Sequence, residues 1–311
     1  MSRIEALLAN DTAGDPMTGL KWSRRSTYTL SDTLAAEGLA ACPNTVASLL
    51  KENGFSLKRN RKEIGETQHP QRNAQFEHIA VTKDEFQDHG QPMISVDSKK
   101  RELVGSFLNK GQTWCREAER VFIHDFRTQA QGVALPYGIY DWVGNTGTVI
   151  VGTSHDTSEF AVDAIETWLT SYGWYHYPHM SELLILCDAG GSNSCRTHLW
   201  KYALSQRLVQ EHGISVRVCH YPSGASKWNP IDHRLFSQIS LNWAGVPLTS
   251  HQVVLNYIRT VSTKTGLTVD ATLNRKRYDT GKKVPKDEFK QINLTTHMPL
   301  PQWNYTIAPH A

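Results

Sequence analysis

Three aspartates stand in the sequence where apolar residues are expected. Asp97 ends the apolar run of residues 93–96, and Asp188 ends the longer apolar run of residues 183–187. Asp232 lies at the expected beginning of a later helix. Polar groups at the ends of buried strands are typical of ligand sites in open α/β sheets. We therefore interpret Asp97, Asp188 and Asp232 as candidate catalytic and metal-binding residues.

Three carboxylates that converge on one place repel each other unless a cation holds them together. Carboxylate and water oxygens are the ligands that Mg²⁺ prefers, so a shared Mg²⁺ or Mn²⁺ ion would satisfy all three. This arrangement favours metal-dependent phosphoryl transfer. A purely structural role is the alternative for each residue: Asp97 and Asp188 could form turns at strand ends, and Asp232 could complement a helix dipole.

The elements that must position these aspartates follow one another as three strands, helix, strand, helix, strand and helix. The expected strands cover residues 93–96, 103–107, 148–152, 183–187 and 214–218, and the expected helices cover 158–171, 195–211 and 231–243. This order is typical of the ribonuclease-H-like fold, an α/β fold with a mixed sheet and helices on both faces. The first and fourth strands are neighbours in that fold, so Asp97 and Asp188 are expected to meet. Apolar residues follow Asp232 at spacings of 3, 4 and 7, which turns this carboxylate towards the sheet.

Length and composition indicate an ordinary globular protein. The chain has 311 residues, of which 39% are hydrophobic and 20% are charged, which is enough to bury a full core. No apolar run reaches the roughly 18 residues that a membrane span needs, and residues 1–20 lack the pattern of a secretory signal. The five cysteines form no CxxC pair, which predicts reduced thiols in a cytoplasmic protein. Since no apolar run is long enough for a membrane span, we expect no membrane partner.

Residues 27–54 predict two short helices joined by a turn. Pro43 begins the second helix, whose outer face is polar. The pattern resembles a helix-turn-helix, whose second helix enters a major groove of DNA, and the basic run that follows supports a nucleic-acid partner. Two amphipathic helices without a DNA partner are the alternative. The side chains expected to contact DNA are Thr45, Ser48, Lys51, Lys58, Arg59, Arg61 and Lys62.

Composition changes along the chain suggest four segments. We expect a helix-turn-helix-like DNA-binding segment over residues 1–62, a linker over 63–91, a ribonuclease-H-like catalytic domain over 92–250 and a basic C-terminal extension over 251–311. Four more residues near the aspartates in sequence are candidates for contact with phosphates or bases: Lys99, Lys100, Lys227 and Trp228. Solvated lysines and ordinary packing of the tryptophan are the alternatives for these four.

Nine blocks of sequence together match the pattern of a known family. They are Val96–Gly105, Pro136–Asp141, Asp156–Val162, Asp188–Asn193, Cys219–Pro222, Ser226–Asn229, His233–Ser237, Thr263–Leu267 and Trp303–Ile307. These blocks closely resemble the Rhodopirellula-type DDE transposases of bacterial insertion sequences. The resemblance covers nearly the whole chain.

The resemblance implies a ribonuclease-H-like fold and two divalent ions, Mg²⁺ or Mn²⁺, which serve DNA strand cleavage and strand transfer. It maps the metal-binding triad onto Asp97, Asp188 and Asp232. The implied partners are the terminal inverted repeats of the element, its target DNA, and further copies of the chain in a homo-oligomer on DNA.

The chain departs from the family pattern at two places. The family has Glu at the third acidic position, where this chain has Asp232, whose side chain is shorter by one methylene. Family members also have a longer region before Gly14, so we expect the segment of residues 1–62 to be N-terminally truncated. Two alternatives to an active transposase stay open: a truncated, catalytically impaired copy that acts as a DNA-binding regulator, and a generic ribonuclease-H-like nuclease.

Overall fold

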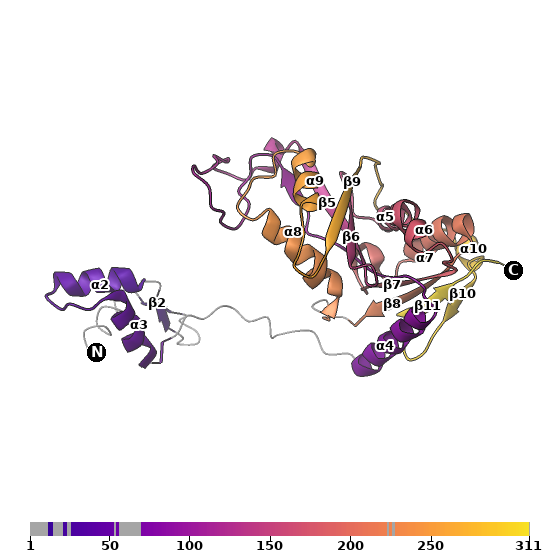
Figure 1. Ribbon diagram of the computed structural model, residues 1–311, viewed down its shortest axis with the longest axis horizontal. Helices are drawn as coiled ribbons and strands as arrows, with labels where there is room; N and C mark the ends of the chain where they lie inside the picture. The colour runs from indigo at the N-terminus through magenta and orange to yellow at the C-terminus, as the bar shows by residue number, and fades with distance from the viewer. Residues whose placement is uncertain are drawn as a thin grey trace. The chain divides into compact units, whose positions relative to one another are not determined.

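The computed structural model describes residues 12–14, 21–23, 26–52, 54–55, 70–222, 224–225 and 228–310 (Figure 1). The chain divides into two compact units, Met1–Ile64 and Gly65–Ala311. Within the described ranges, none of the helices has both the length and the apolar character that crossing a membrane requires.

The smaller unit contains a two-stranded antiparallel ribbon and two helices. The elements are β1 (Thr12–Gly14), β2 (Lys21–Ser23), α2 (Thr27–Ala36) and α3 (Pro43–Glu52). The Ser26 hydroxyl accepts a hydrogen bond from the Thr29 N–H at 3.0 Å and so caps α2. Leu30, Leu34 and Val46 are buried in one cluster that joins the two helices. Both expected helices are therefore present, while their contact with DNA stays a prediction.

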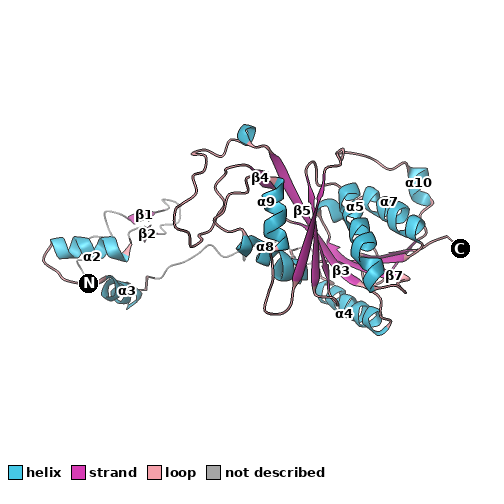
Figure 2. Ribbon diagram, turned by 45° about the horizontal axis from the view of Figure 1, so that its top comes forward, coloured by secondary structure: helices cyan, strands magenta, loops and turns pink. Residues whose placement is uncertain are grey.

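The larger unit is built on one mixed sheet with helices on both faces (Figure 2). The strands lie in the order β10, β11, β8, β7, β3, β5, β6 and β9, and β4 pairs with part of β5. Their bounds are β3 (Met93–Ser98), β4 (Glu102–Val104), β5 (Gly132–Asp141), β6 (Thr146–Gly152), β7 (Glu182–Asp188), β8 (Ser215–Tyr221), β9 (Thr268–Asn274), β10 (Leu294–Thr296) and β11 (Asn304–Ile307).

The five central strands define the fold class. β3 is antiparallel to β5, and β5 is antiparallel to β6. On its other side β3 is parallel to β7, which is parallel to β8. Three antiparallel strands joined through the first of them to two parallel strands form the ribonuclease-H-like topology. The predicted fold class is confirmed, and the strands that carry Asp97 and Asp188 are neighbours.

Helices cover both faces of this sheet (Figure 2). Residues of α5 and α7 belong to the core on one face, and residues of α4, α8 and α9 pack on the other. The helices are α4 (Arg72–Asp88), α5 (Ser158–Trp168), α6 (Trp174–His176), α7 (His198–Leu204), α8 (Ser237–Asn242), α9 (His251–Arg259) and α10 (Lys286–Lys290). π-Helical segments extend three of them: Leu169–Gly173, Ser205–Gln210 and Asp232–Phe236.

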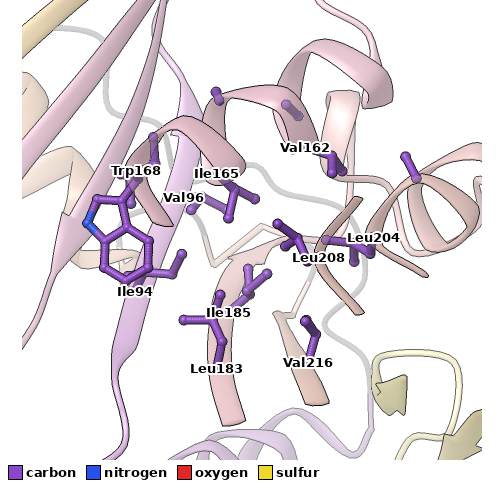
Figure 3. Packing of buried hydrophobic residues seen from close by; sticks show 14 of the residues in the cluster. Ile94, Val96, Val162, Ile165, Trp168, Leu183, Ile185, Leu204, Leu208 and Val216 are labelled. Atoms are coloured by element: carbon purple, nitrogen blue, oxygen red, sulfur yellow. The ribbon is translucent and has the colours of Figure 1, made fainter. Parts of the chain in front are cut away.

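The largest core cluster lies between the sheet and helices α5 and α7 (Figure 3). Ile165 and Trp168 of α5 and Leu204 of α7 are fully buried in this cluster, together with Ile94 of β3 and Ile185 of β7. Burial of one such side chain contributes about 1.5–3 kcal/mol. This packing fixes β3 and β7 to each other, and with them the carboxylates at their ends.

The strand predicted over residues 103–107 is present but shorter, as β4, and it is not the second strand of the fold. β4 ends at Val104, and β5 is the antiparallel partner of β3. The backbone of Gly105 has φ of 149°, and its N–H donates to the carbonyl of Leu248 at 2.8 Å. This turn takes the chain out of the sheet at residue 105, and β5 begins only at Gly132.

The larger unit also extends beyond the predicted boundaries of residues 92–250. Helix α4, which lies in the expected linker, buries Ile79 and Phe86 in a cluster with residues of β3, β7 and β8. Strands β9, β10 and β11, which lie in the expected C-terminal extension, join the sheet. The physical reason is that β9 pairs with β6 and β11 with β8, which covers two sheet edges that would otherwise expose unpaired backbone groups.

Candidate active site

The ends of β3 and β7 bring Asp97 and Asp188 side by side. The parallel register pairs Val96 with Cys187, so the next position along both strands holds the two aspartates. Neighbouring strands are about 5 Å apart, and side chains alternate between the two faces. Met93, four residues before Asp97, is buried in the cluster with α4, so this carboxylate lies on the same face.

Two glycines let the helix that carries Asp232 approach that face closely. Gly138 is the register partner of Asp97, and a Cβ at this glycine would lie 2.6 Å from Cε1 of Phe236. A Cβ at Gly147 would lie 2.5 Å from a methyl carbon of the same helix. Larger residues at these positions would therefore push the helix off the sheet. The absence of both side chains lets Asp232 lie near the end of β3.

The three carboxylates interact with one another electrostatically. Burial and the negative charges of Asp188, Asp232 and Asp156 raise the pKa of Asp97 to about 7, although the Ser98 N–H opposes this shift. Burial and Asp232 also raise the pKa of Asp188, and burial raises the pKa of Asp232. Each carboxylate is therefore harder to ionise than an ordinary aspartate, because water is partly removed and like charges are near.

Few protein donors compensate these charges. The Ser98 N–H donates to Oδ1 of Asp97 at 2.7 Å, and Nδ2 of Asn229 donates to Oδ1 of Asp188 at 3.2 Å. Asn229 is fully buried, and its Oδ1 has no hydrogen-bond partner within the described part of the chain. Buried polar atoms are almost always satisfied, so an orphaned amide oxygen beside Asp188 indicates a missing partner.

This donor set fits a divalent cation. Asp97, Asp188 and Asp232 supply the hard oxygen ligands that Mg²⁺ and Mn²⁺ take, and the amide oxygen of Asn229 adds a neutral one. A bound cation would offset the burial that raises all three pKa values and the like charges that add to the shifts of Asp97 and Asp188.

A second acidic cluster is different. Ligand atoms of Glu166, Glu211 and His212 lie within 4.8 Å of one another. Arg207 already binds both glutamates, through Nη2 to Glu166 Oε2 at 2.6 Å and through Nη1 to Glu211 Oε1 at 3.0 Å. The protein therefore neutralises this cluster with its own guanidinium, whereas within the described residues no arginine or lysine forms an ion pair with Asp97 or Asp188.

Basic and aromatic groups border the aspartates. Asp97 and Asp188 line an open groove with the glycines that follow β7 and with exposed Arg196, and Asp232 lines a second groove with Lys99 and Lys100. Burial lowers the pKa of Lys99, whose Nζ lies 3.5 Å from Glu102 Oε1 and 4.8 Å from the ring centroid of Trp243. The two lysines therefore lie beside the candidate site, while their contact with phosphates stays a prediction.

The other predicted DNA contacts are more scattered. Thr45, Ser48 and Lys51 are exposed on α3, where their spacing of three residues puts them along one side of the helix. Trp228 is 55% exposed, and the centroid of its ring lies 6.0 Å from that of Phe76 of α4, with the two rings tilted by 67°. The remaining predicted contacts lie outside the described residues: Lys58, Arg59, Arg61, Lys62 and Lys227.

Some residues of the site are not evident from the sequence. The roles of Asn229 and Gly138 depend on contacts with distant segments, and sequence patterns alone do not show them. Only the position of Asn229, three residues before Asp232, offers a signal. Asp156 is exposed and contributes negative potential at Asp97, although it is not one of the three predicted ligands.

The fold and the three aspartates define a ribonuclease-H-like protein with an acidic site at the ends of its parallel strands. Residues 3–309 match the family described as "Rhodopirellula transposase DDE domain", and the chain belongs to this family of DDE transposases. The suspected family is therefore confirmed.

Similar solved structures are transposase complexes. The Mos1 transposase paired-end complex with left transposon end is 14% identical, with a TM-score of 0.44 over 83% of this chain and 69% of that chain. The Mos1 strand transfer complex is 14% identical, with a TM-score of 0.43 over 83% and 68%. The Mos1 mariner paired-end complex with Mn is 14% identical, with a TM-score of 0.41 over 83% and 69%. Comparison with curated proteins gave no match.

Proposed function

We propose that the chain is a DDE-type transposase that cuts and joins DNA strands at the terminal inverted repeats of its own insertion sequence. The observation that carries this proposal is the set of three half-buried, mutually repelling carboxylates at the ends of β3 and β7 and on the helix beside them. Membership of a DDE transposase family supports it.

All three aspartates take part in holding two Mg²⁺ or Mn²⁺ ions. Asp97, whose pKa both other carboxylates raise, would hold the ions together with Asp188 and Asp232. When bound, the ions activate a water or a 3′-hydroxyl as nucleophile and stabilise charge on the leaving oxygen. Asn229 orients the carboxylate of Asp188 through its Nδ2–H.

DNA is held by other parts of the chain. The exposed face of α3 with Thr45, Ser48 and Lys51 enters a major groove of the terminal repeat. Lys99 and Lys100, in the groove with Asp232, bind the phosphates near the strand that is cut. Two copies of the chain act together on the two ends of the element.

Cleavage and strand transfer test this proposal. We expect the full chain to nick a duplex that carries the terminal repeat only when Mg²⁺ or Mn²⁺ is present, and to join the released 3′ end to target DNA. Asp97→Asn and Asp188→Asn should abolish both reactions and leave the circular dichroism spectrum unchanged. Metal-independent cleavage, or full activity of both variants, contradicts the proposal, and cleavage without joining indicates a ribonuclease-H-like nuclease.

The identity of residue 232 favours a second candidate function. Asp232 is shorter by one methylene than the glutamate of the family pattern, and active sites tolerate little displacement of their ligands. A protein impaired in this way would act as a DNA-binding regulator of the parent element. Salt-dependent binding to the terminal repeat, with no cleavage by either the wild type or Asp232→Glu, would favour the regulator over the transposase.

A further inference from the structure

A chain of buried hydrogen bonds ends on the main chain of Asp188. The Nε1–H of Trp200 donates to Oη of Tyr305 at 2.8 Å, and Oη of Tyr305 lies 3.0 Å from Nε2 of His220. Nδ1 of His220 lies 3.0 Å from the carbonyl oxygen of Asp188. The side chains of Trp200, Tyr305 and His220 are fully buried, so bulk water cannot replace any of these partners.

The chemistry of the four groups sets the direction of the chain. An indole N–H can only donate, and a carbonyl oxygen can only accept. Tyr305 therefore accepts from Trp200 and directs its own O–H at Nε2 of His220. A neutral imidazole that accepts at Nε2 carries its proton on Nδ1, and this proton faces the carbonyl of Asp188. The thiol of Cys187, 3.4 Å from the same Nδ1, is only a weak acceptor.

The hydrogen bond from His220 to Asp188 lies where the pairing of β7 with β8 ends. Asp188 is the last residue of β7, and its register partner Tyr221 is the last residue of β8. Beyond this point the strand pairing ends, glycines follow at positions 190 and 191, and the next backbone contact is from the Cys195 N–H to the carbonyl of Ala189 at 3.3 Å. A side-chain donor on the carbonyl of Asp188 therefore restrains the main chain where the sheet no longer does.

We propose that His220 is a positioning residue, whose Nδ1–H fixes the main chain of Asp188 and thereby the direction of its carboxylate. Tyr305 and Trp200 hold the imidazole in the required tautomer, and Asn229 holds the carboxylate itself from another side at 3.2 Å. The proposal rests on the proposed function, in which Asp188 is a metal ligand. Groups that orient metal ligands in this way typically change metal affinity by about 10–100-fold when they are removed.

Two substitutions of His220 distinguish the role of its Nδ1 from that of its Nε2. The amide N–H of asparagine reaches the position of Nδ1, whereas the longer glutamine reaches that of Nε2. We expect His220→Asn to bind Mn²⁺ within about threefold of the wild type, and His220→Gln to bind it about 10–100-fold more weakly. Calorimetric titration of the full chain with Mn²⁺ alone, well below the unfolding midpoints, measures this without any cleavage reaction.

Tyr177→Phe is the control for a general loss of stability. It removes another partly buried hydroxyl, which donates to Asp141 at the opposite end of the β3–β5 pair. We expect this variant to unfold at a lower temperature and to bind Mn²⁺ as the wild type does. Equal affinities for the two His220 variants, or a loss in Tyr177→Phe as large as that in His220→Gln, would overturn the proposal.

The tautomer gives an independent measurement on the unaltered protein. Long-range ¹H–¹⁵N spectra of histidine-labelled protein should show His220 with its proton on Nδ1, and a proton on Nε2 would overturn the proposal. If the His220 variants do not fold, Tyr305→Phe, which removes one hydroxyl, should weaken Mn²⁺ binding by about tenfold. If the wild type binds no Mn²⁺, the proposed function fails instead, and the tautomer still decides whether His220 donates to Asp188.

Discussion

Asp141 and Asp97 lie at opposite ends of the same antiparallel strand pair, where Asp141 faces Ile94 and Asp97 faces Gly138. Asp141 is fully buried, and it accepts hydrogen bonds from two backbone N–H groups and from the hydroxyl of Tyr177, all at 2.8–3.2 Å. Asp97 accepts from one N–H and is surrounded by other carboxylates. Donors of the protein satisfy the first carboxylate, whereas the described residues offer the second a single N–H donor, as the proposed metal site requires. Buried carboxylates of one sheet thus differ in role according to their donors.

The strongest test of this comparison is to remove the charge at each end in turn. A bound cation contributes several kcal/mol of transition-state stabilisation, and about 1.4 kcal/mol corresponds to a factor of ten in rate, so Asp97→Asn should lower metal-dependent nicking by about 10³-fold or more. The same change should not lower the free energy of unfolding of the metal-free protein, because it removes a repelling charge. Nicking rates and urea unfolding measure the two effects.

Asp141→Asn should show the reverse pattern. Weaker hydrogen bonds to a neutral amide should lower the free energy of unfolding by about 1.5–3 kcal/mol. Nicking per folded molecule should be unchanged, because residue 141 lies at the far end of β5. A large loss of nicking in this variant, at a temperature where it is folded, would remove the distinction between the two ends.

The pH dependence of stability sharpens the comparison. The pKa of Asp97 rises from 3.8 to about 7 on folding, so the folded state holds this proton over a range in which the unfolded chain has lost it. The stabilisation is fully present below about pH 4 and is lost as pH rises through about 7, by roughly 4 kcal/mol in total. The wild type should therefore lose stability relative to Asp97→Asn over this range when metal is absent, and Mn²⁺ should reverse the loss.

The quantity to measure is the difference in the free energy of unfolding between the wild type and Asp97→Asn at each pH. Burial lowers the pKa of His220 to about 4, and a histidine buried in its neutral form gains stability as pH rises towards its ordinary pKa. That contribution has the opposite sign and is present in both proteins, so it cancels in the difference. If the free energies of unfolding of the wild type and Asp97→Asn change with pH in the same way between pH 4 and 7, Asp97 is not the group whose pKa rises on folding.

A steric change at Gly138 tests how Asp232 is placed. The Cβ of Gly138→Ala would lie 2.6 Å from Phe236 Cε1 and would push the helix that carries Asp232. A displacement of about 1 Å in an active site costs about 10²-fold in rate, so nicking should fall by this order. Adding Phe236→Leu should restore part of the activity by making room, and Gly144→Ala, near Asp141, should not affect nicking in the folded protein. No rescue by Phe236→Leu would mean that the helix position does not limit activity.

The smallest expected effect comes from Asn229. Asn229→Ala removes the Nδ2–H that holds the carboxylate of Asp188, and we expect about tenfold weaker Mn²⁺ binding, which calorimetry measures. Asn229→Asp should weaken binding less than Asn229→Ala if the oxygen of this side chain is itself a ligand. Equal affinities of the wild type and Asn229→Ala would leave Asp188 without support from this residue.

The candidate ligands and the fold class could be predicted because both depend on local pattern. A carboxylate that ends a continuous apolar run is visible in residues 183–188, and the order of strands and helices around it narrows the topology. Asp232 could be placed on the inner side of its helix from the spacing of the apolar residues that follow. These signals need no knowledge of distant contacts.

The boundaries of the unit and the supporting residues could not be predicted, because they depend on contacts between distant segments. Helix α4 has a polar sequence, and one of the residues that attach it to the sheet is Gln75. This side chain is fully buried and forms two reciprocal hydrogen bonds of 2.7 Å with Asn304. The two residues are 229 positions apart, so no window of the sequence shows the pair. The turn that ends β4 at Gly105 also depends on a distant segment, because the Gly105 N–H donates to the carbonyl of Leu248. For this reason the sequence does not show that β5 is the second strand of the fold.

The position of β11 between β8 and β10 has a consequence for synthesis of the protein. Asn304 and Tyr305 supply the partners of Gln75 and His220, so the surroundings of Asp188 stay incomplete until residue 307 has been translated. Closing contacts across more than two hundred residues is also slow, because the chain loses much entropy before the contact forms. A nascent chain that has not yet reached β11 therefore holds Asp188 without the buried hydrogen bonds that Tyr305 and Asn304 give to His220 and Gln75.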